Sequence, residues 1–225
     1  MHWIQEKECY ILMTTEEKRK YYTSDKYVEL KDIICWGDYS LKINSCNQSI
    51  VDINNHVSLY FGNIIALEVD VIVNAANDRL RCGGGVDSAI HNAANRKLLM
   101  AECRSLDGCE TGNCKITGGY CLPAKYVIHA VGPFGENKSL LQSCYQRALE
   151  LLERNNLKSI AFPCISTGIY EYPNENAAHI ALSTVRNWFD TNEYSKQVER
   201  VIFCLFLPID VKIYNELMPK YFPLQ

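Results

Sequence analysis

The segment that most constrains the fold spans residues 71–94 and reads VIVNAANDRLRCGGGVDSAIHNAA. It begins with an apolar, strand-like run at residues 71–73, turns at residues 74–77, and passes through three consecutive glycines into a helical pattern at residues 86–94. A strand, a glycine loop and a helix start are typical of the way α/β proteins hold phosphates. Glycine lets the backbone approach an anion, and the first helical N–H groups point at it. The segment therefore predicts an anion-binding loop in an α/β protein.

Short apolar runs alternate with helical patterns along most of the chain. Strands are predicted at residues 57–61, 71–73, 126–131, 159–162 and 201–206. Apolar residues share one helical face over residues 140–152 and 177–188, and a last helix is predicted over residues 210–221. This alternation predicts an α/β sheet that helices cover on both faces.

The first 55 residues are polar and mixed, without a sustained strand pattern. Thr14-Thr15-Glu16-Glu17 is typical of a helix start, with a threonine cap and early acids, so a short helix to about Lys20 is expected. Ile33, Ile34 and Trp36 are expected to anchor this segment on the core, and residues 44–55 read as an Asn-rich linker. We therefore divide the chain into a helical extension with a linker, residues 1–55, and a domain, residues 56–225.

Length and composition exclude several classes of protein. The 225 residues fit one domain with an extension, and 48% hydrophobic residues are enough for a substantial core. A net charge of −3 gives no basic field for nucleic acid, and no apolar run reaches the roughly 18 residues of a membrane span. The 11 cysteines are scattered without a C-x-x-C pair, and the acidic N-terminus lacks a signal-peptide core. We expect reduced thiols, no metal, no cofactor, no membrane or nucleic-acid partner, and an intracellular monomer in the cytoplasm or nucleus.

Three residues of the first loop are candidates for chemistry. Asn77 follows a predicted strand end, where its amide suits sugar hydroxyls, although a turn-forming asparagine has the same signature. Asp87 lies in the first helical turn, where it either complements the helix dipole or stands beside a phosphate as a site residue. The helix N-terminus should keep Asp87 ionised, and His91, four residues on, shares its helix face.

A second loop, residues 162–170, leaves another predicted strand end with the sequence FPCISTGIY. Its small residues can form an anion nest, with Tyr170 available to stack on a sugar or base, although an ordinary strand-to-helix loop would look similar. Asn63 ends the first core strand and either reads a base edge or forms a turn. His129 and Cys164 lie within apolar runs, so we expect core residues and not a nucleophile pair.

Together these stretches closely resemble the macrodomain family, specifically MacroD-type ADP-ribosyl hydrolases. The resemblance runs from about residue 57 to residue 222 and rests on the segments VSLYFGNI, LEVDVIVNAAN, GGGVDSAIH, TGNCKITGGYCLPAKYVIHAVGP, AFPCISTGIYEYPNE and VIFCLF. It implies a three-layer α/β/α fold with a mixed central sheet that binds ADP-ribose in a cleft. It also implies removal of mono-ADP-ribose from acidic side chains of proteins, and deacetylation of O-acetyl-ADP-ribose. A non-catalytic ADP-ribose reader is the alternative.

The resemblance also implies a role for each matching residue. It assigns Asn77, Asp87 and His91 to catalysis, with Asn77 at the distal ribose and His91 behind the acid. The implied ADP-ribose contacts are Asn63 at the adenine and the neighbouring Ile64, then Asn77, Gly84, Gly85, Val86 and Asp87 on the first loop, and Ser166, Thr167, Gly168, Ile169 and Tyr170 on the second. The chain departs from the family pattern at Asn63, where an aspartate is usual, and at Cys82, Ser88, Asn95 and Arg96.

Overall fold

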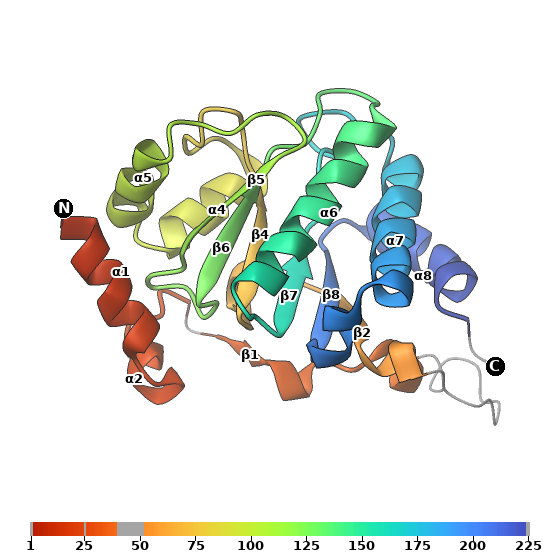
Figure 1. Cartoon of the computed structure of the whole chain (residues 1–225), viewed down its shortest axis with the longest axis horizontal. Coiled ribbons are helices and arrows are strands. Elements are labelled where there is room, and N and C mark those ends of the chain that lie inside the picture. The colour runs from red at the N-terminus through yellow and green to blue at the C-terminus, as the bar shows by residue number, and fades with distance from the viewer. Residues whose placement is uncertain (1, 25, 40–51, 224–225) are drawn as a thin grey trace.

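A six-stranded mixed sheet forms the centre of the molecule. The computed structural model describes residues 2–24, 26–39 and 52–223 (Figure 1). The strand order is β2-β8-β7-β4-β6-β5, and every neighbouring pair is parallel except β5 and β6. A second sheet pairs β1 with β3 in parallel. The predicted mixed α/β sheet is therefore confirmed.

The elements follow one another along the chain with short connections. The strands are β1 (Val28–Glu29), β2 (Val57–Phe61), β3 (Leu67–Glu68), β4 (Val71–Ala75), β5 (Cys114–Gly118), β6 (Tyr126–Ala130), β7 (Ser159–Phe162) and β8 (Arg200–Leu205). The α-helices are α1 (His2–Leu12), α2 (Thr15–Arg19), α4 (Gly85–Ala93), α5 (Arg96–Ser105), α6 (Lys138–Arg154), α7 (Asn174–Thr191) and α8 (Pro208–Tyr221). Short 3-10 turns are η1 (Leu30–Asp32), η2 (Asp52–Asn55), η3 (Ile64–Ala66) and η4 (Glu193–Gln197).

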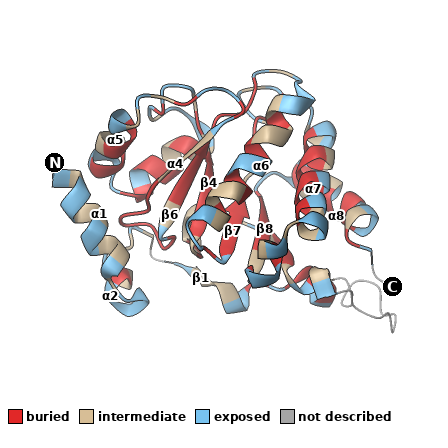
Figure 2. Cartoon of the chain, viewed as in Figure 1, coloured by how far each residue is buried: buried red, intermediate tan, exposed pale blue. Residues whose placement is uncertain are grey.

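Helices cover both faces of the sheet and bury two separate cores. One core joins α6, α7 and α8 to side chains such as Val71 and Phe203, and the other joins α4 and α5 to side chains such as Ile72 and Val127. Successive strand residues point to opposite faces, so neighbouring Val71 and Ile72 serve different cores. Figure 2 shows the sheet almost wholly buried between these helices. The expected three-layer arrangement is confirmed.

The N-terminal extension packs along the side and lower edge of the sheet as drawn in Figure 1. Helix α2 has the expected threonine cap, because the Thr14 side chain accepts from the Glu17 N–H and Glu17 reaches back to the cap. Helix α1 was not predicted, and none of its residues is buried. Lys7 of α1 binds the buried Glu102 of α5 with 2.6 Å between Nζ and Oε1. This ion pair and the partly buried Trp3 and Tyr10, which pack against the core, therefore hold α1 on the domain.

Several sequence predictions need correction. Ile33 and Trp36 are buried as expected, but Ile34 is exposed and does not anchor the extension. The antiparallel edge strand β5 and the helix α5 were missed. The predicted linker falls mostly outside the described residues, and its last four residues form η2. Because β1 pairs with β3, the two predicted parts share a sheet, and the division at residue 55 stays a prediction.

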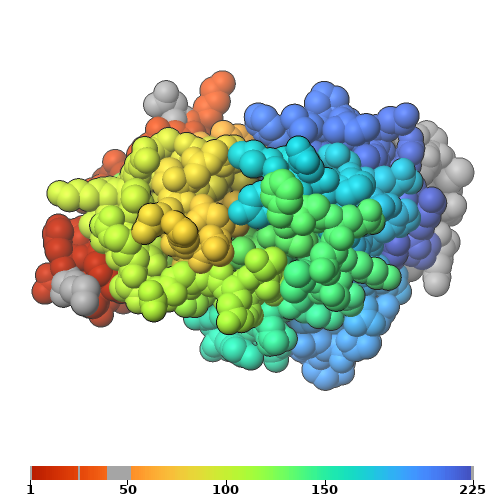
Figure 3. All heavy atoms as spheres, turned by 90° about the horizontal axis from the view of Figure 1, so that it is seen from above, coloured from red at the N-terminus to blue at the C-terminus, as the bar shows by residue number. Residues whose placement is uncertain are grey.

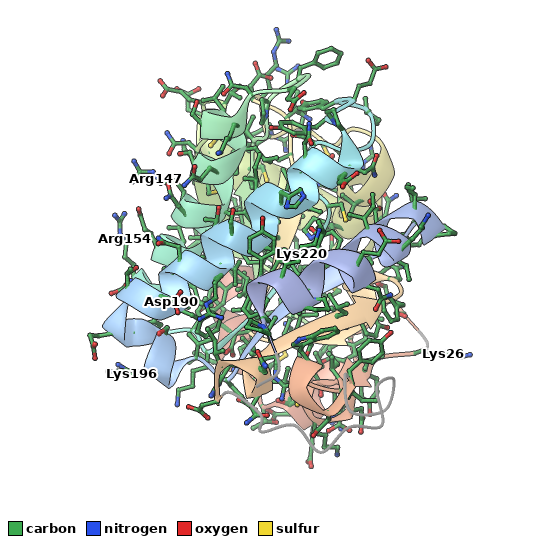
Figure 4. All side chains as sticks on the ribbon, turned by 90° about the vertical axis from the view of Figure 1, so that its right-hand side faces the viewer. Lys26, Arg147, Arg154, Asp190, Lys196 and Lys220 are labelled. Atoms are coloured by element: carbon green, nitrogen blue, oxygen red, sulfur yellow. The ribbon has the colours of Figure 1, made fainter. Side chains whose placement is uncertain are left out.

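The outer faces of the helices carry charged side chains. In Figure 4, Arg147 and Arg154 extend from α6 into solvent. Both arginines approach Glu150 on the same helix, at 2.9 Å and 3.4 Å. Within the described residues, no helix is long and apolar enough to cross a membrane. The ten cysteines of the described part are all free thiols.

Candidate functional site

A cavity of about 630 Å³ lies where the parallel strands end. Its wall is formed by the segments that follow β2, β4, β6, β7 and β8. The segments after β4, β6 and β7 lie at the top of Figure 1, and Figure 3 looks down on them, in gold, green and cyan. Every residue that the sequence assigned to ADP-ribose contact lines this cavity. Loops after parallel strands converge on one edge of the sheet, which is why residues so far apart in sequence meet here.

Asn77 faces the cavity and also shapes its loop. Its side-chain Nδ2 donates to the Arg81 carbonyl at 2.5 Å, and its Oδ1 accepts from the Arg81 N–H at 3.1 Å. Asn77 therefore forms a turn, as one interpretation of the sequence predicted. Only one of its two amide protons is used in that turn, so the other is left for a ligand in the cavity that Asn77 lines. A Cβ atom at Gly83 would lie 3.5 Å from both Asn77 Nδ2 and Asp87 Oδ2, so the two predicted catalytic groups flank the same glycine.

The glycines that follow leave open space for a ligand at the start of α4. Gly85 has φ of +59°, a left-handed backbone that strains any L side chain, and a Cβ there would touch nothing within 4 Å. The first N–H groups of α4 have no partner within the helix, so the helix start offers donors to an anion. The open space at Gly85 and the free N–H donors at the start of α4 therefore agree with the predicted phosphate loop.

Asp87 is held at the wall of the cavity by two directed hydrogen bonds. Asn74 Nδ2 donates to Oδ1 at 2.6 Å, and the Gly83 N–H donates to Oδ2. His91 Nε2 lies 3.5 Å from Oδ1, close enough to favour the ionised carboxyl although the geometry is not that of a hydrogen bond. Burial by itself raises the pKa of Asp87, but His91, Asn74 and Gly83 together outweigh burial, and this pKa lies below its usual value. Asp87 is an ionised carboxylate, as the helix start predicted.

His91 does not reach the cavity. It is fully buried beneath Asp87 and is absent from the cavity wall. His91 therefore lies behind Asp87, as the resemblance implies, and its part in catalysis stays a prediction.

His91, Cys103 and His129 lie together behind the site, with potential metal-ligand atoms within 4.8 Å of one another. Both ring nitrogens of His129 are already engaged, by Asn74 at 3.1 Å and by Thr117 at 2.9 Å. Burial raises the pKa of Cys103 to about 12, so its thiol stays protonated. This donor set does not fit a metal, because Cys103 stays protonated and both nitrogens of His129 are engaged, so only His91 offers a free ligand atom. We interpret His129 and its hydrogen-bond partners as a support for the wall.

The second loop closes the opposite side of the cavity. Ser166 has φ of +67° and a buried hydroxyl without a partner among the described residues. A Cβ at Gly132 would lie 2.1 Å from Ser166 Oγ, so only glycine fits beside this serine. Ile169 is 67% exposed, yet its Cδ1 would lie 3.0 Å from a Cβ on Gly84, so it spans the gap between the two loops. Residues from both loops therefore enclose the space between them.

The far end of the cavity begins after β2. Asn63 is exposed, and its Oδ1 accepts from the Ile65 N–H at 3.2 Å as the cap of η3. This bond leaves the amide nitrogen of Asn63 free to donate. Cys164 was expected in the core but is only partly buried and lines the cavity. His129 is a core residue, as expected.

Sequence reasoning missed several residues of the wall. Phe206 and Leu207 line the cavity and are 75% and 45% exposed, and Gly132 lines it beside the second loop. Phe206 ends the strand predicted at residues 201–206, and Leu207 and Gly132 follow predicted strands, so the rule that ligands bind at the carboxyl ends of strands could have found them. Asn74 was noticed only as part of a turn, although it binds Asp87 directly.

Known proteins resemble this chain in both sequence and structure. A family model described as Macro domain matches residues 73–181. ADP-ribose glycohydrolase MACROD2 of Mus musculus is 51% identical over 98% of this chain, which spans 49% of that protein. ADP-ribose glycohydrolase MACROD1 of Rattus norvegicus is 43% identical over 98% of this chain and 89% of the relative. The crystal structure of a Trypanosoma brucei macrodomain in complex with ADP-ribose is 34% identical, covers 94% of both chains and has a TM-score of 0.77. The chain spans about half the length of the MACROD2 relatives that it matches.

Proposed function

Since this chain belongs to the macrodomain family, we propose that its cavity binds ADP-ribose and that it removes mono-ADP-ribose from acidic side chains of modified proteins. The observation that carries this proposal is Asp87, an ionised carboxylate fixed at the wall of the cavity beside a glycine loop. The names of the relatives support it, because MACROD1 and MACROD2 are ADP-ribose glycohydrolases. The Trypanosoma brucei complex supports ADP-ribose as the ligand.

In the proposed reaction, the start of α4 and the second loop bind the diphosphate through backbone N–H groups. Asn77 donates its remaining amide proton to a hydroxyl of the distal ribose. Asp87 orients a water near the anomeric carbon of that ribose. The water oxygen forms a bond to this carbon, the bond from the carbon to the ester oxygen breaks, and the protein carboxylate leaves with the electron pair. Positioning and charge placement account for the acceleration.

The lowered pKa of Asp87 supports a role as an ionised carboxylate over a role as a general acid. A general acid must hold a proton at working pH, and Asp87 is ionised there. Asp87 therefore orients the water and can accept a proton from it. No step needs a metal ion, and the cavity wall offers no cluster of metal ligands among the described residues.

One assay tests the proposal directly. The purified protein is incubated with a protein that carries ADP-ribose on glutamate or aspartate, and released ADP-ribose is measured, with free ADP-ribose affinity determined in parallel. Release with multiple turnovers is expected. Tight binding without release would instead make the chain an ADP-ribose reader.

Deacetylation of O-acetyl-ADP-ribose is a second candidate activity, since the same cavity would hold the shared ADP-ribose part. Competition between the two substrates ranks them. We further propose that the protein acts as an intracellular monomer, in the cytoplasm or nucleus, which its free thiols support.

A further inference from the structure

We propose that His129 is a positioning residue for the reaction: its unprotonated Nδ1 fixes the amide of Asn74, and this amide aims the carboxylate of Asp87 into the cavity. The inference rests on the proposed function, because it assigns Asp87 a water to orient. It adds two side chains that lie outside the cavity wall and touch no ligand.

The backbone brings these groups together. Asn74 on β4 and His129 on β6 are register partners in neighbouring parallel strands, and both side chains are fully buried. Asn74 Nδ2 lies 3.1 Å from His129 Nδ1 and 2.6 Å from Asp87 Oδ1. One amide nitrogen therefore links the sheet to the carboxylate on α4.

The direction of each hydrogen bond follows from the end groups. The carboxylate of Asp87 can only accept, so the amide group that faces it must be the nitrogen of Asn74. That nitrogen has two protons, and the second points at His129 Nδ1, which must accept it. His129 then carries its proton on Nε2 and donates to Thr117 Oγ1 at 2.9 Å, and Thr117 donates to the Gly118 carbonyl at 3.3 Å. This series of hydrogen bonds thus runs from the Gly118 carbonyl at one end to the Asp87 carboxylate at the other.

The surroundings of His129 keep it neutral. The titratable groups around the ring are Asp87 and His91 from α4 and Cys103 from α5, whose Sγ lies 3.7 Å from Nε2. Burial, followed by the nearby His91, lowers the pKa of His129 to about 3, although Asp87 acts in the opposite direction. A proton on Nδ1 would face the Asn74 amide, which can only donate there, and would break the bond. The buried ring therefore holds one tautomer at working pH.

This arrangement matters because Asp87 has few other restraints. Asn74 holds Oδ1 and the Gly83 N–H holds Oδ2, so the two bonds together fix the plane of the carboxylate. If Asn74 lost its contact with His129, its amide could rotate, and the carboxylate would turn with it. A small misplacement of a catalytic group lowers the rate by up to about 100-fold without weakening substrate binding.

The test compares two variants that differ in whether they can accept a hydrogen bond from Asn74. His129→Leu removes the acceptor, whereas His129→Asn places an amide oxygen near the former Nδ1, where it can accept from Asn74. We expect kcat of His129→Leu to fall on the order of 10-fold to 100-fold with KM nearly unchanged, and His129→Asn to recover most of the loss. Unfolding temperatures of both variants show whether they fold. Equal kcat for wild type and His129→Leu, or equal losses in both variants, would overturn the proposal.

Two spectroscopic readouts do not depend on activity. Nitrogen-15 NMR of wild-type protein should show His129 with its proton on Nε2, and a proton on Nδ1 would overturn the proposal even if neither variant folds. Carbon-13 titration should show a higher pKa for Asp87 in His129→Leu than in wild type, because the amide no longer steadies the carboxylate; an unchanged value would count against the link. If wild type releases no ADP-ribose from any substrate, the proposed function fails, while these two readouts still test the hydrogen-bond chain.

Discussion

The molecule has one cavity at the carboxyl ends of its strands, called the carboxyl edge, and one at their amino ends, called the amino edge. The two cavities differ in whether the polar groups that line them already have partners. The larger, of about 630 Å³, lies at the carboxyl ends of the strands. The smaller, of about 290 Å³, lies at the amino ends, between the sheet and the N-terminal extension. Glycines and loop backbone line the first, whereas acidic and basic side chains line the second.

At the amino edge, the acidic side chains of Asp70 and Glu68 already have partners. Lys125 Nζ lies 2.9 Å from Asp70, and Arg19 lies 2.6 Å from Glu68. At the carboxyl edge, the Ser166 hydroxyl has no partner among the described residues, and Gly85 leaves open space. Buried polar groups normally have hydrogen-bond partners. A cavity wall whose polar groups lack partners therefore indicates a ligand site, whereas a wall whose polar groups are paired indicates a structural role. Variants at the carboxyl edge should therefore change binding or activity, and variants at the amino edge should change stability.

The largest expected effect is on catalysis at the carboxyl edge. Asp87→Ala should lower turnover on the order of 100-fold or more, because the group that orients the water is lost. Asp87→Asn, which keeps the shape but removes the charge, is the matched control for lost packing and should be equally inactive. Turnover and ADP-ribose affinity are measured on variants whose unfolding temperature shows that they fold. Near-wild-type turnover in either variant would falsify the role of Asp87.

The next effect is on binding. Gly85→Glu should abolish detectable ADP-ribose binding, because its side chain would enter the open space at the start of α4 and its charge would repel phosphates. Gly85→Ala has the same left-handed backbone strain, of about 1–2 kcal/mol, without the charge or the bulk. Calorimetry on both variants separates the two causes. If the glutamate variant binds as well as the alanine variant, the glycine is only a turn residue.

A smaller effect is expected at the far end of the cavity. In Asn63→Asp, one carboxylate oxygen can keep the bond to the Ile65 N–H while the other faces the cavity as a charged acceptor. Charge-assisted hydrogen bonds are the stronger kind, and desolvation offsets part of the gain, so we expect ADP-ribose binding to tighten by about 1 kcal/mol, roughly fivefold in Kd. Saturated turnover should barely change. Equal or weaker affinity would mean that Asn63 makes another contact.

Much of the fold could be predicted from the sequence because its parallel strands are fully buried. Runs such as residues 71–73 and 160–162 are continuously apolar, which is typical of strands covered on both faces. The missed strand β5 lies at the edge, and three of its five residues are only partly buried. An edge strand with mixed residues lacks the signal that identified the others.

The site likewise has a part that could be predicted from the sequence and a part that could not. The loop residues could be predicted because glycines and small polar residues at strand ends have few other uses. The support behind Asp87 could not, since His129 lies in an apolar run and has the appearance of a core residue, and the sequence places Asn74 in a turn although it lies in β4. Their partners are 13 and 55 residues away along the chain, and only the strand register brings them together.

The smallest expected effect on activity, and a measurable one on stability, concerns Lys18 at the amino edge. Its side chain is buried and donates to the Ala124 carbonyl at 2.7 Å, and burial lowers the pKa of Lys18 from 10.5 to about 7. The folded protein therefore binds this proton less tightly than the unfolded chain. The buried charge therefore lowers the unfolding free energy by its full amount below pH 7. This destabilisation decreases as the pH rises from 7 toward 10.5.

Between pH 6 and pH 9 the unfolding free energy of wild type should rise by up to about 3 kcal/mol from this group, and Lys18→Met should remove that rise. The lost bond to Ala124 lowers the stability of this variant equally at all pH values, so only the slope is diagnostic. Lys20→Met, the same substitution at an exposed position two residues on, is the control and should keep the wild-type slope. Urea unfolding at both pH values measures the slope, and ADP-ribose affinity and turnover should match wild type in both variants. A changed affinity for Lys18→Met would show that the two edges of the sheet are coupled, and an unchanged slope would show that the buried amine keeps its proton.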